Sequence, residues 1–318
     1  MPSPASSPLI LEKQGSFFVG GRTIQSGMLS RHPAFEASGT FCVDQVYVRF
    51  QIPASTLRQP LILVHGCCMT GKTWETTPDG RMGWDEYFLR QGHPVYVVDQ
   101  AWRGRSAADV TTVIGARAGQ IAPGEMPAVF MNAQQGAWKS FRFGPDYPNV
   151  FPGLQFPVHA IDEFWKQMVP DWSEELPAPN PTVPAILELA GMLRGAVVIS
   201  HSQSGFYPFQ AAAMSSSGIR GIISIEPGEC PPADGDLAPY MDIPIQILWG
   251  DYVDQSPRWS PRLESCQQFV TALNAAGGHA ENTLLPDIGI LGNSHILMQD
   301  MNSLDIAEWI SDWIERCV

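Results

Sequence analysis

The chain has 318 residues, of which 44% are hydrophobic and 16% charged, which is enough apolar material for one large core or two smaller ones and excludes a disordered chain. Its formal net charge of −13, without any cluster of lysines or arginines, excludes a nucleic-acid partner because phosphates would be repelled. Glu188 and Arg194 interrupt the longest apolar candidate before it reaches about 18 residues, so no membrane-spanning helix is expected.

The first hundred residues predict strands and helices in alternation. Residues 16–19 and 46–52 are rich in aromatic and β-branched side chains and predict antiparallel strands. The apolar runs at 61–64 and 95–98 are typical of strands buried on both faces, and residues 84–91 between them predict a helix. This order indicates a parallel sheet with crossover helices.

The middle of the chain, residues 107–182, breaks this pattern with recurring prolines and interleaved aromatic residues, and we interpret it as a large insertion. Within it, residues 160–168 have helical spacing, with Phe164 and Trp165 as anchors. The alternation then resumes with helices 183–193, 205–215, 261–276 and 304–316 and strands 196–200, 221–226, 244–249 and 282–285. We therefore predict a single α/β domain over residues 1–318, with a mostly parallel central sheet, flanking helices and a cap-like insertion.

A tight turn with a central serine follows the predicted strand at 196–199. The sequence SHSQSG at 200–205 places Ser202 where a strand-to-helix elbow would hold a nucleophile. Small residues must stand two positions before and after it, because the strand and the helix approach closely; here these are Ser200 and Ser204. An ordinary serine-rich loop remains the alternative for this motif.

A catalytic base should follow Ser202, since α/β enzymes with this elbow order their triad as serine, acid and histidine. Only His279 and His295 come later in the chain. His279 lies between a helix and the start of a strand, at the amino end of the sheet. His295 follows the last strand, at the carboxyl end where ligands gather, and is the better candidate.

Two strand ends offer the acid of the triad. Glu226 ends the strand after that of Ser202, whereas Asp251 and Asp254 follow the next strand. The later strand is the usual location and favours Asp254. Glu226, however, has no evident structural reason to stand at an apolar strand end, where an unpaired carboxylate is costly. The residues alone leave the acid open.

The oxyanion hole requires backbone N–H donors, and two segments can supply them. One donor should be the amide of Gln203, next to the nucleophile, and the other that of Cys67, in the loop after strand 61–64. Cys67 and Cys68 could be two small reduced side chains in a tight turn, or could join in a strained eight-membered ring. A thiol nucleophile is the weaker alternative, because neither cysteine occupies an elbow.

Together these motifs resemble the α/β-hydrolase family. The resemblance rests on His65-Gly66 after a strand, on Asp99 and residues 103–106 after the next, on Ser202, and on His295 near the end. It covers nearly all of residues 40–318 outside the insertion. Serines in place of both elbow glycines are a departure from the family pattern, as is the undecided role of Asp251 and Asp254.

More narrowly, the chain is similar to a group of bacterial esterases within this family. This resemblance implies Glu226 as the acid, with Asp254 as the alternative, and a vicinal disulfide between Cys67 and Cys68. It also implies a homodimer and a periplasmic or secreted protein. The segment Met1-Pro2-Ser3-Pro4 lacks the features of a signal peptide, so we expect a mature chain.

These expectations combine into a serine carboxylic-ester hydrolase that forms an acyl-enzyme and needs no cofactor or metal. The triad would be Ser202, His295 and Glu226, and the substrate a small ester in an apolar pocket beneath the insertion. Lactone opening, amide cleavage or acyl transfer could use the same triad, and a non-catalytic binding protein is the alternative of another class. The sequence does not name the ester, and it leaves the pairing of four cysteines undecided: Cys42, Cys230, Cys266 and Cys317.

Overall fold

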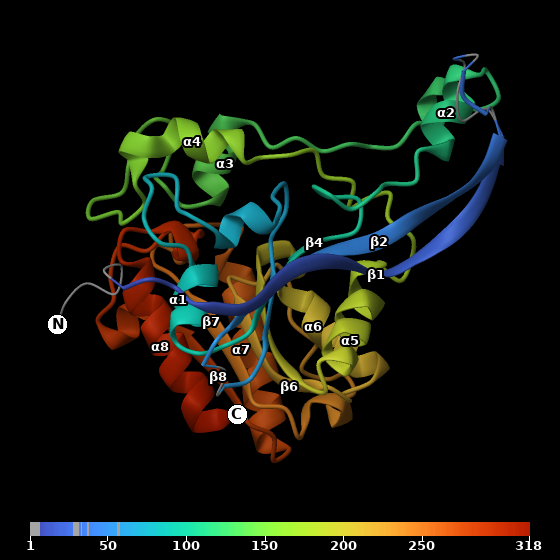
Figure 1. Cartoon of the computed structure of the whole chain (residues 1–318). Helices are drawn as coiled ribbons and strands as arrows, with labels where there is room; N and C mark the ends of the chain where they lie inside the picture. Colours follow the sequence, from blue (N-terminus) through green and yellow to red (C-terminus); the bar gives the residue numbers. More distant parts are fainter. Residues whose placement is uncertain (1–6, 28–31, 33, 37, 56–57) are drawn as a thin grey trace.

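A computed structural model describes residues 7–27, 32, 34–36, 38–55 and 58–318 of the chain. Their strands form an eight-stranded sheet in the order β1-β2-β4-β3-β5-β6-β7-β8, in which β2 is antiparallel to β1 and β4 and the other neighbours are parallel (Figure 1). The strands are β1 (Leu11–Gly27), β2 (Ser38–Pro53), β3 (Leu61–Val64), β4 (Val95–Asp99), β5 (Ala196–His201), β6 (Ile219–Ile225), β7 (Ile245–Trp249) and β8 (Ala280–Leu284). The predicted mostly parallel sheet is confirmed.

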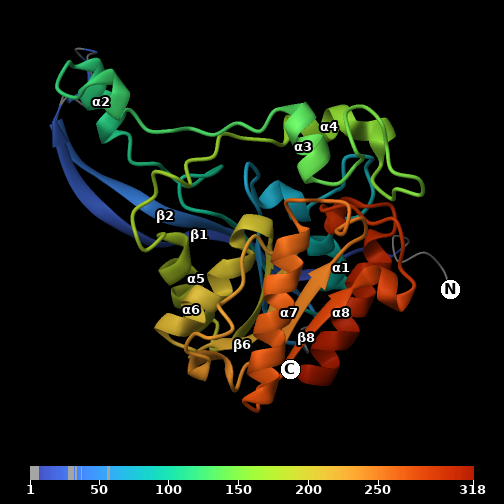
Figure 2. The same cartoon turned by 180° about the vertical axis from the view of Figure 1, so that it is seen from behind.

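Helices cover both faces of this sheet, as Figures 1 and 2 show together. One face packs against α1 (Trp84–Arg90) and α8 (Ser303–Cys317), and the other against α5 (Thr182–Met192), α6 (Tyr207–Met214) and α7 (Ser260–Ala275). Because successive side chains of a strand point to opposite faces, Leu61 and Leu63 join the core under α1 and α8, and Ile62 and Val64 join the other. The apolar run of β3 therefore serves two cores at once.

The hairpin of β1 and β2 is longer than the sequence predicted. Residues 47–51 of β2 pair with β4, whereas the β1–β2 ladder continues to Gly27 opposite Ser38. The predicted strands 16–19 and 46–52 are thus only the part of the hairpin that lies on the sheet. The rest extends beyond it as a two-stranded arm (Figure 1).

The insertion divides into two parts in space. Its first helix, α2 (Thr111–Arg117), lies beside the tip of the hairpin arm, as both views show (Figures 1 and 2). Its other helices, α3 (Gln134–Ser140) and α4 (Ile161–Lys166), lie on the far side of the molecule, above α1 and α8. The predicted helix at 160–168 corresponds to α4, which a short 3-10 turn at Val158–Ala160 precedes, and its anchor Phe164 is buried.

The predicted elements after residue 182 all exist, with boundaries displaced by at most two residues, except at the serine turn. There the expected helix 205–215 is divided into a 3-10 helix (Ser202–Phe206) and α6. A disulfide joins Cys230 and Cys266, which settles that pairing, whereas Cys42 and Cys317 are free. None of the helices within the described residues is both long and apolar enough to span a membrane. The segment Met1-Pro2-Ser3-Pro4 lies outside the described residues.

Candidate active site

Ser202 stands on a strained turn between β5 and the 3-10 helix. Its φ is 57°, in the left-handed region that non-glycine residues rarely adopt. Gly205 packs closely against the segment after β6, since an added Cβ would lie 2.7 Å from Cα of Pro227. At Ser204 the hydroxyl accepts a hydrogen bond from the His201 amide at 3.1 Å and donates to a backbone carbonyl. A serine thus stabilises the turn where the family motif has glycine.

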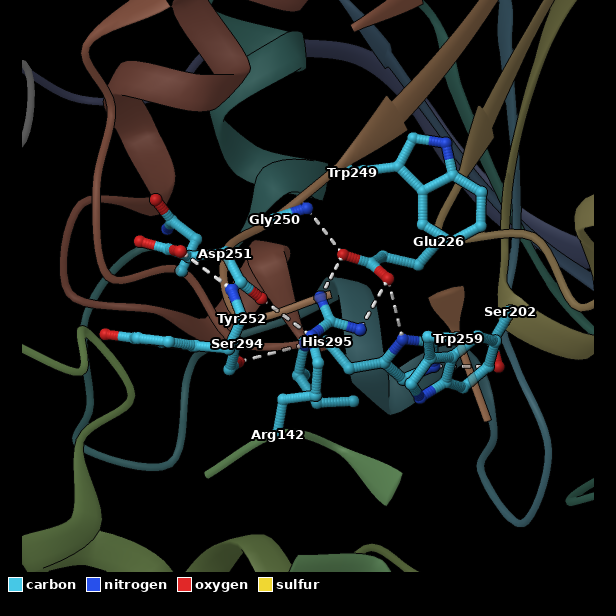
Figure 3. A network of polar contacts seen from close by, with 12 residues as sticks. Arg142, Ser202, Glu226, Trp249, Gly250, Asp251, Tyr252, Trp259, Ser294 and His295 are labelled. Atoms are coloured by element: carbon cyan, nitrogen blue, oxygen red, sulfur yellow. Dashed lines mark hydrogen bonds and ion pairs between the residues drawn. The ribbon is translucent and has the colours of Figure 1, made fainter. Parts of the chain in front are cut away.

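The structure brings three of the predicted residues into one hydrogen-bonded chain. Oγ of Ser202 lies 2.9 Å from Nε2 of His295, and Nδ1 of His295 lies 3.1 Å from Oε2 of Glu226 (Figure 3). Ser202 follows β5, Glu226 follows β6, and His295 lies in the loop between β8 and α8. Because the carboxyl ends of parallel strands meet at one edge of a sheet, residues 93 apart in sequence become neighbours.

Glu226 is completely buried and is held by donors on both oxygens. Nη1 of Arg142 donates to its Oε2 at 2.8 Å, Nη2 of Arg142 donates to its Oε1, and the amide of Gly250 donates to Oε1 at 2.5 Å (Figure 3). Burial by itself would raise the pKa of this carboxyl. The positive charge of Arg142 and the hydrogen bond of His295 overcome that effect and lower the pKa to about 2. Glu226 is therefore an ionised carboxylate facing the imidazole.

His295 is also fully buried, and its ring is stacked on Trp259 with ring centroids 4.2 Å apart. Burial lowers the pKa of His295 to about 4, against the opposing effect of Glu226. The imidazole is thus neutral near pH 7, and Nε2 can accept a proton from the serine hydroxyl if Nδ1 donates to Glu226. This is the protonation state that a general base needs.

The alternative acids do not contact His295. Asp254 is exposed, and Nδ1 of His295 is bonded to Glu226 instead. Asp251 uses its carboxylate locally, since it accepts hydrogen bonds from the amides of Tyr252 at 2.7 Å and Gly292 at 2.8 Å. It organises the loops around the site.

His279 immediately precedes β8 at the amino end of the sheet, where it lines a separate cavity of about 620 Å³. This cavity is larger than the one at Ser202, but its lining contains no residue of the Ser202–His295–Glu226 chain. His279 therefore lies outside the hydrogen-bonded chain that contains His295.

The two expected oxyanion donors flank Ser202. Gln203 is the second residue of the 3-10 helix, so its N–H has no acceptor within that helix. Cys67 lies in the loop after β3, and within the described residues its amide donates no hydrogen bond to another group. Both residues and Ser202 line a cleft of about 440 Å³.

A buried ion pair fixes both donor segments. Arg103 and Asp171 form a salt bridge with 0% exposure of either side chain. Oδ2 of Asp171 accepts the amide hydrogen of Cys68 at 3.0 Å and a side-chain N–H of Gln203 at 3.3 Å. Burial opposes ionisation of Asp171, but the charge of Arg103 and the hydrogen bonds from Ser173 and Cys68 together outweigh it and lower the pKa of the carboxyl. One carboxylate thus ties the loop of β3 to the elbow.

The structure does not contain the vicinal disulfide that the resemblance implies. The Sγ atoms of Cys67 and Cys68 lie 3.1 Å apart and both residues are free thiols, whereas a disulfide requires about 2.05 Å. The two sulfurs and the Asp171 carboxylate lie within 4.8 Å of one another, the spacing of a metal site. Arg103 already neutralises that carboxylate and would repel a cation, so the cluster does not favour a metal.

Sequence reasoning missed Arg142, Asp171 and Trp259. All three are buried and two belong to the insertion, where the proline-rich pattern predicts no element that would place them. Their partners lie far away in sequence: Arg142 is 84 residues from Glu226, and Asp171 is 103 residues from Cys68. A charged residue in an aromatic-rich segment was the only available signal.

Comparison with known proteins decides the family. A solved structure of a novel bacterial esterase, determined at atomic resolution, is 52% identical to this chain, with a TM-score of 0.97 over 100% of this chain and 99% of that one. The chain belongs to the α/β-hydrolase family of esterases. It is a carboxylesterase, and the predicted fold and enzyme class are confirmed.

A more distant relative agrees with this assignment. The esterase is 24% identical, over 98% of its length and 96% of the relative, to a probable secreted lipase, phiG, of a fungal species (strain ATCC 74256). No family model matches the chain.

Proposed function

We propose that this esterase cleaves carboxylic esters through an acyl-enzyme, with Ser202, His295 and Glu226 as its triad. The observation that carries the proposal is the unbroken chain from Oγ of Ser202 through both ring nitrogens of His295 to Oε2 of Glu226. Each group has the protonation state that its role requires: a neutral base and an ionised acid. The positive φ of Ser202 also fits a nucleophile elbow.

In the first half of the reaction, Oγ of Ser202 attacks the ester carbonyl while Nε2 of His295 takes the hydroxyl proton. The resulting tetrahedral oxyanion accepts hydrogen bonds from the amides of Cys67 and Gln203. Imidazolium then donates the proton to the departing alcohol, and the C–O bond of the ester breaks. Glu226 holds the ring in place and stabilises its transient positive charge.

In the second half, water replaces the alcohol. Nε2 of His295 removes a proton from this water as its oxygen attacks the acyl carbonyl, and the same amides hold the second oxyanion. The proton returns to Oγ of Ser202 as the acid product leaves. No metal or cofactor takes part in these steps.

The vicinal disulfide of Cys67 and Cys68 remains part of the proposal for the oxidised enzyme. The sulfurs are in contact at 3.1 Å, and Cys68 has a φ of 59°, so the backbone is already in an unusual conformation. A ring closed there would hold the Cys67 amide rigid toward the oxyanion. Mild reduction should lower ester turnover without unfolding, and equal turnover of both forms, with thiols counted, would contradict this role.

The insertion at 107–182 acts as a cap in this proposal. Phe130, Ser173 and Glu174 from the insertion line the cleft at Ser202, together with Trp259. These side chains would contact the acyl or alcohol group of the ester. Export of the protein is proposed from the secreted lipase relative, and a homodimer from the resemblance to bacterial esterases.

A fluorophosphonate probe tests the nucleophile directly, because it labels only an activated serine. The wild-type enzyme should be labelled at Ser202, and Ser202→Ala should lose both labelling and ester turnover. The matched control is Ser200→Ala, since Ser200 is also buried, lies two residues earlier in β5, and its hydroxyl makes no hydrogen bond within the described residues. Labelling at another residue, or full activity of Ser202→Ala, would refute the mechanism.

A further inference from the structure

Two residues of the insertion contact the base and the acid of the proposed triad, and the residue before them, Ser140, is linked to the base through Trp259. The carbonyl of Ser140 accepts a hydrogen bond from Nε1 of Trp259 at 2.6 Å, and the Trp259 ring stacks on His295. The carbonyl of Phe141 accepts the amide hydrogen of His295 at 2.8 Å. Arg142 then reaches Glu226 (Figure 3). The turn after α3 therefore holds the side of the triad that is remote from Ser202.

Arg142 uses every nitrogen of its guanidinium in this turn. Both Nη atoms donate to the two oxygens of Glu226, and Nε donates to the carbonyl of Asp251 at 2.7 Å. The side chain is 1% exposed, and its backbone has a φ of 57°. A planar fork of this kind fixes the plane of a carboxylate as well as its charge, which a lysine cannot do.

Glu226 depends on this contact because its strand end offers few other donors. Apart from Arg142, and among the residues that the structure describes, its carboxylate accepts one backbone hydrogen bond, from Gly250, and contacts His295. A fully buried carboxylate with so few donors would take up a proton rather than remain charged. A protonated acid could not stabilise the imidazolium that forms during catalysis.

We propose that Arg142 is a positioning residue of the triad, which keeps Glu226 ionised and oriented toward Nδ1 of His295. The insertion then contributes to catalysis itself as well as covering the cleft. This inference rests on the proposed triad, and it adds a fourth residue without which an acid on this early strand would not function. Arg142 does not touch the substrate or the reacting atoms.

The charged and titratable groups around this pair determine its pH dependence. Glu226 faces Arg142 and His295, while His295 also faces Arg258 and the ring of His201, whose centroid is 4.7 Å from its own. Burial holds the pKa of His201 at about 3, so this second histidine is neutral throughout the working range. Arg142 lowers the pKa of Glu226, of His295 and of the buried Asp300, whose pKa burial raises to about 7, so the loss of Arg142 should raise all three.

The kcat/KM profile against pH of Arg142→Gln, beside wild type, tests the proposal. The acidic limb reports protonation of His295, or of Glu226, in the free enzyme. In Arg142→Gln it should move upward by about 1 to 3 pH units, with kcat reduced more than KM is changed. The acidic limb of Arg142→Lys should lie between those of wild type and Arg142→Gln, because lysine restores the positive charge without the planar pair of donors.

Arg103→Gln is the matched control. It also removes a fully buried arginine from a carboxylate, but one that contacts neither Glu226 nor His295. Its acidic limb should stay where it is in wild type. An acidic limb that does not move in Arg142→Gln, or that moves equally in Arg103→Gln, would overturn the proposal.

A double variant separates this inference from the triad itself. If Arg142 acts through Glu226, adding Arg142→Gln to Glu226→Gln should cost less than about 3-fold in kcat, because the carboxylate is already gone. An equal loss in both backgrounds would mean a merely structural role. Near-normal activity of Glu226→Gln alone would instead refute the triad. Thermal melting shows whether the variants fold. If Arg142→Gln does not fold, the position of the acidic limb in the kcat/KM profile of Arg142→Lys tests the proposal instead.

Discussion

At the scale of single residues, the carboxylate that contacts His295 is the one we propose as the acid, and it follows β6 rather than β7. Glu226 directly follows β6, with a φ of 52°, and its carboxylate meets the base at 3.1 Å. Asp254, after the next strand, is exposed to solvent. The positive φ of Glu226 and its contact with Arg142 together let a carboxylate directly after β6 reach Nδ1 of His295.

Exchanging the two candidate acids tests this assignment. Glu226→Gln should lower kcat about 10³- to 10⁴-fold, because a neutral amide neither fixes the histidine tautomer nor stabilises the imidazolium. Asp254→Asn should retain near-normal kcat. The measurement is steady-state hydrolysis of a chromogenic ester, with thermal melts as the folding check. The opposite ranking of the two variants would make Asp254 the acid.

Gly66 offers a second test at this scale. It lies in the loop after β3, which carries the proposed oxyanion donor Cys67, where this loop packs against Ser202. An added Cβ would stand 2.8 Å from Nδ1 of His201 and 3.0 Å from Cβ of Ser202, so the loop must shift. Gly66→Ala should lower kcat about 10²-fold or more, as expected when an oxyanion donor is displaced. Gly191→Ala is the control and should be fully active, because among the described residues no atom outside its own helix lies within 4 Å of an added Cβ. Equal activity of both variants would contradict this placement of the loop.

At the scale of elements, the sequence predicted what local patterns encode. Buried apolar runs indicated β3, β4 and β5, and the small residues after β5 indicated the elbow, because both signals are local. The full hairpin of β1 and β2 was not predicted: within the described residues the strands of its arm pair with each other and with no third strand, and they lack the apolar pattern of a sheet between two cores. The position of α3 was not predicted either, because it depends on tertiary contacts rather than on a local pattern.

The site was predicted only in part for the same reason. Ser202 and Glu226 directly follow β5 and β6, and His295 lies in the loop after β8, so the fold brings all three to one edge of the sheet. Arg142 and Asp171 stand in loops of the insertion, and no rule of spacing brings them to Glu226 and Cys68. The free thiols of Cys67 and Cys68 differ from the disulfide implied by the resemblance, which depends on oxidation as well as on geometry.

Asp171→Asn tests whether the insertion holds the oxyanion loop. The substitution leaves Arg103 buried without its partner and should cost about 3 to 5 kcal/mol of the free energy of unfolding. It should also lower kcat, since the anchor of the Cys68 amide and of the Gln203 side chain is weakened. Urea denaturation and steady-state kinetics measure the two effects. Unchanged kcat in the folded variant would mean that the loop holds its shape alone.

At the scale of the whole molecule, two cores on either side of one sheet support a site built from distant segments. The disulfide of Cys230 and Cys266 ties the loop after β6 to α7, and it closes a separation of 36 residues. Chain-entropy arguments give such a cross-link about 3 to 4 kcal/mol. It connects the segment after Glu226 to the helix that follows Trp259.

Replacing both cysteines of this disulfide by serine should therefore lower the free energy of unfolding by about 3 to 4 kcal/mol, as measured by urea denaturation. Activity should be retained below the unfolding transition, because neither residue touches the triad. Replacing the free cysteines Cys42 and Cys317 in the same way is the control and should change stability little. A loss no greater than in the control would show that the cross-link adds nothing.

In the proposed mechanism Ser202 carries the acyl group between the two half-reactions. Rapid acid quenching during turnover of a nitrophenyl ester whose deacylation is the slower step, followed by peptide mass spectrometry, detects this intermediate. We expect a burst of nitrophenol equal to the enzyme concentration and an acyl group on the peptide that contains Ser202, both absent in Ser202→Ala. An acyl group found on Cys67 instead, or a burst that persists in Ser202→Ala, would contradict it.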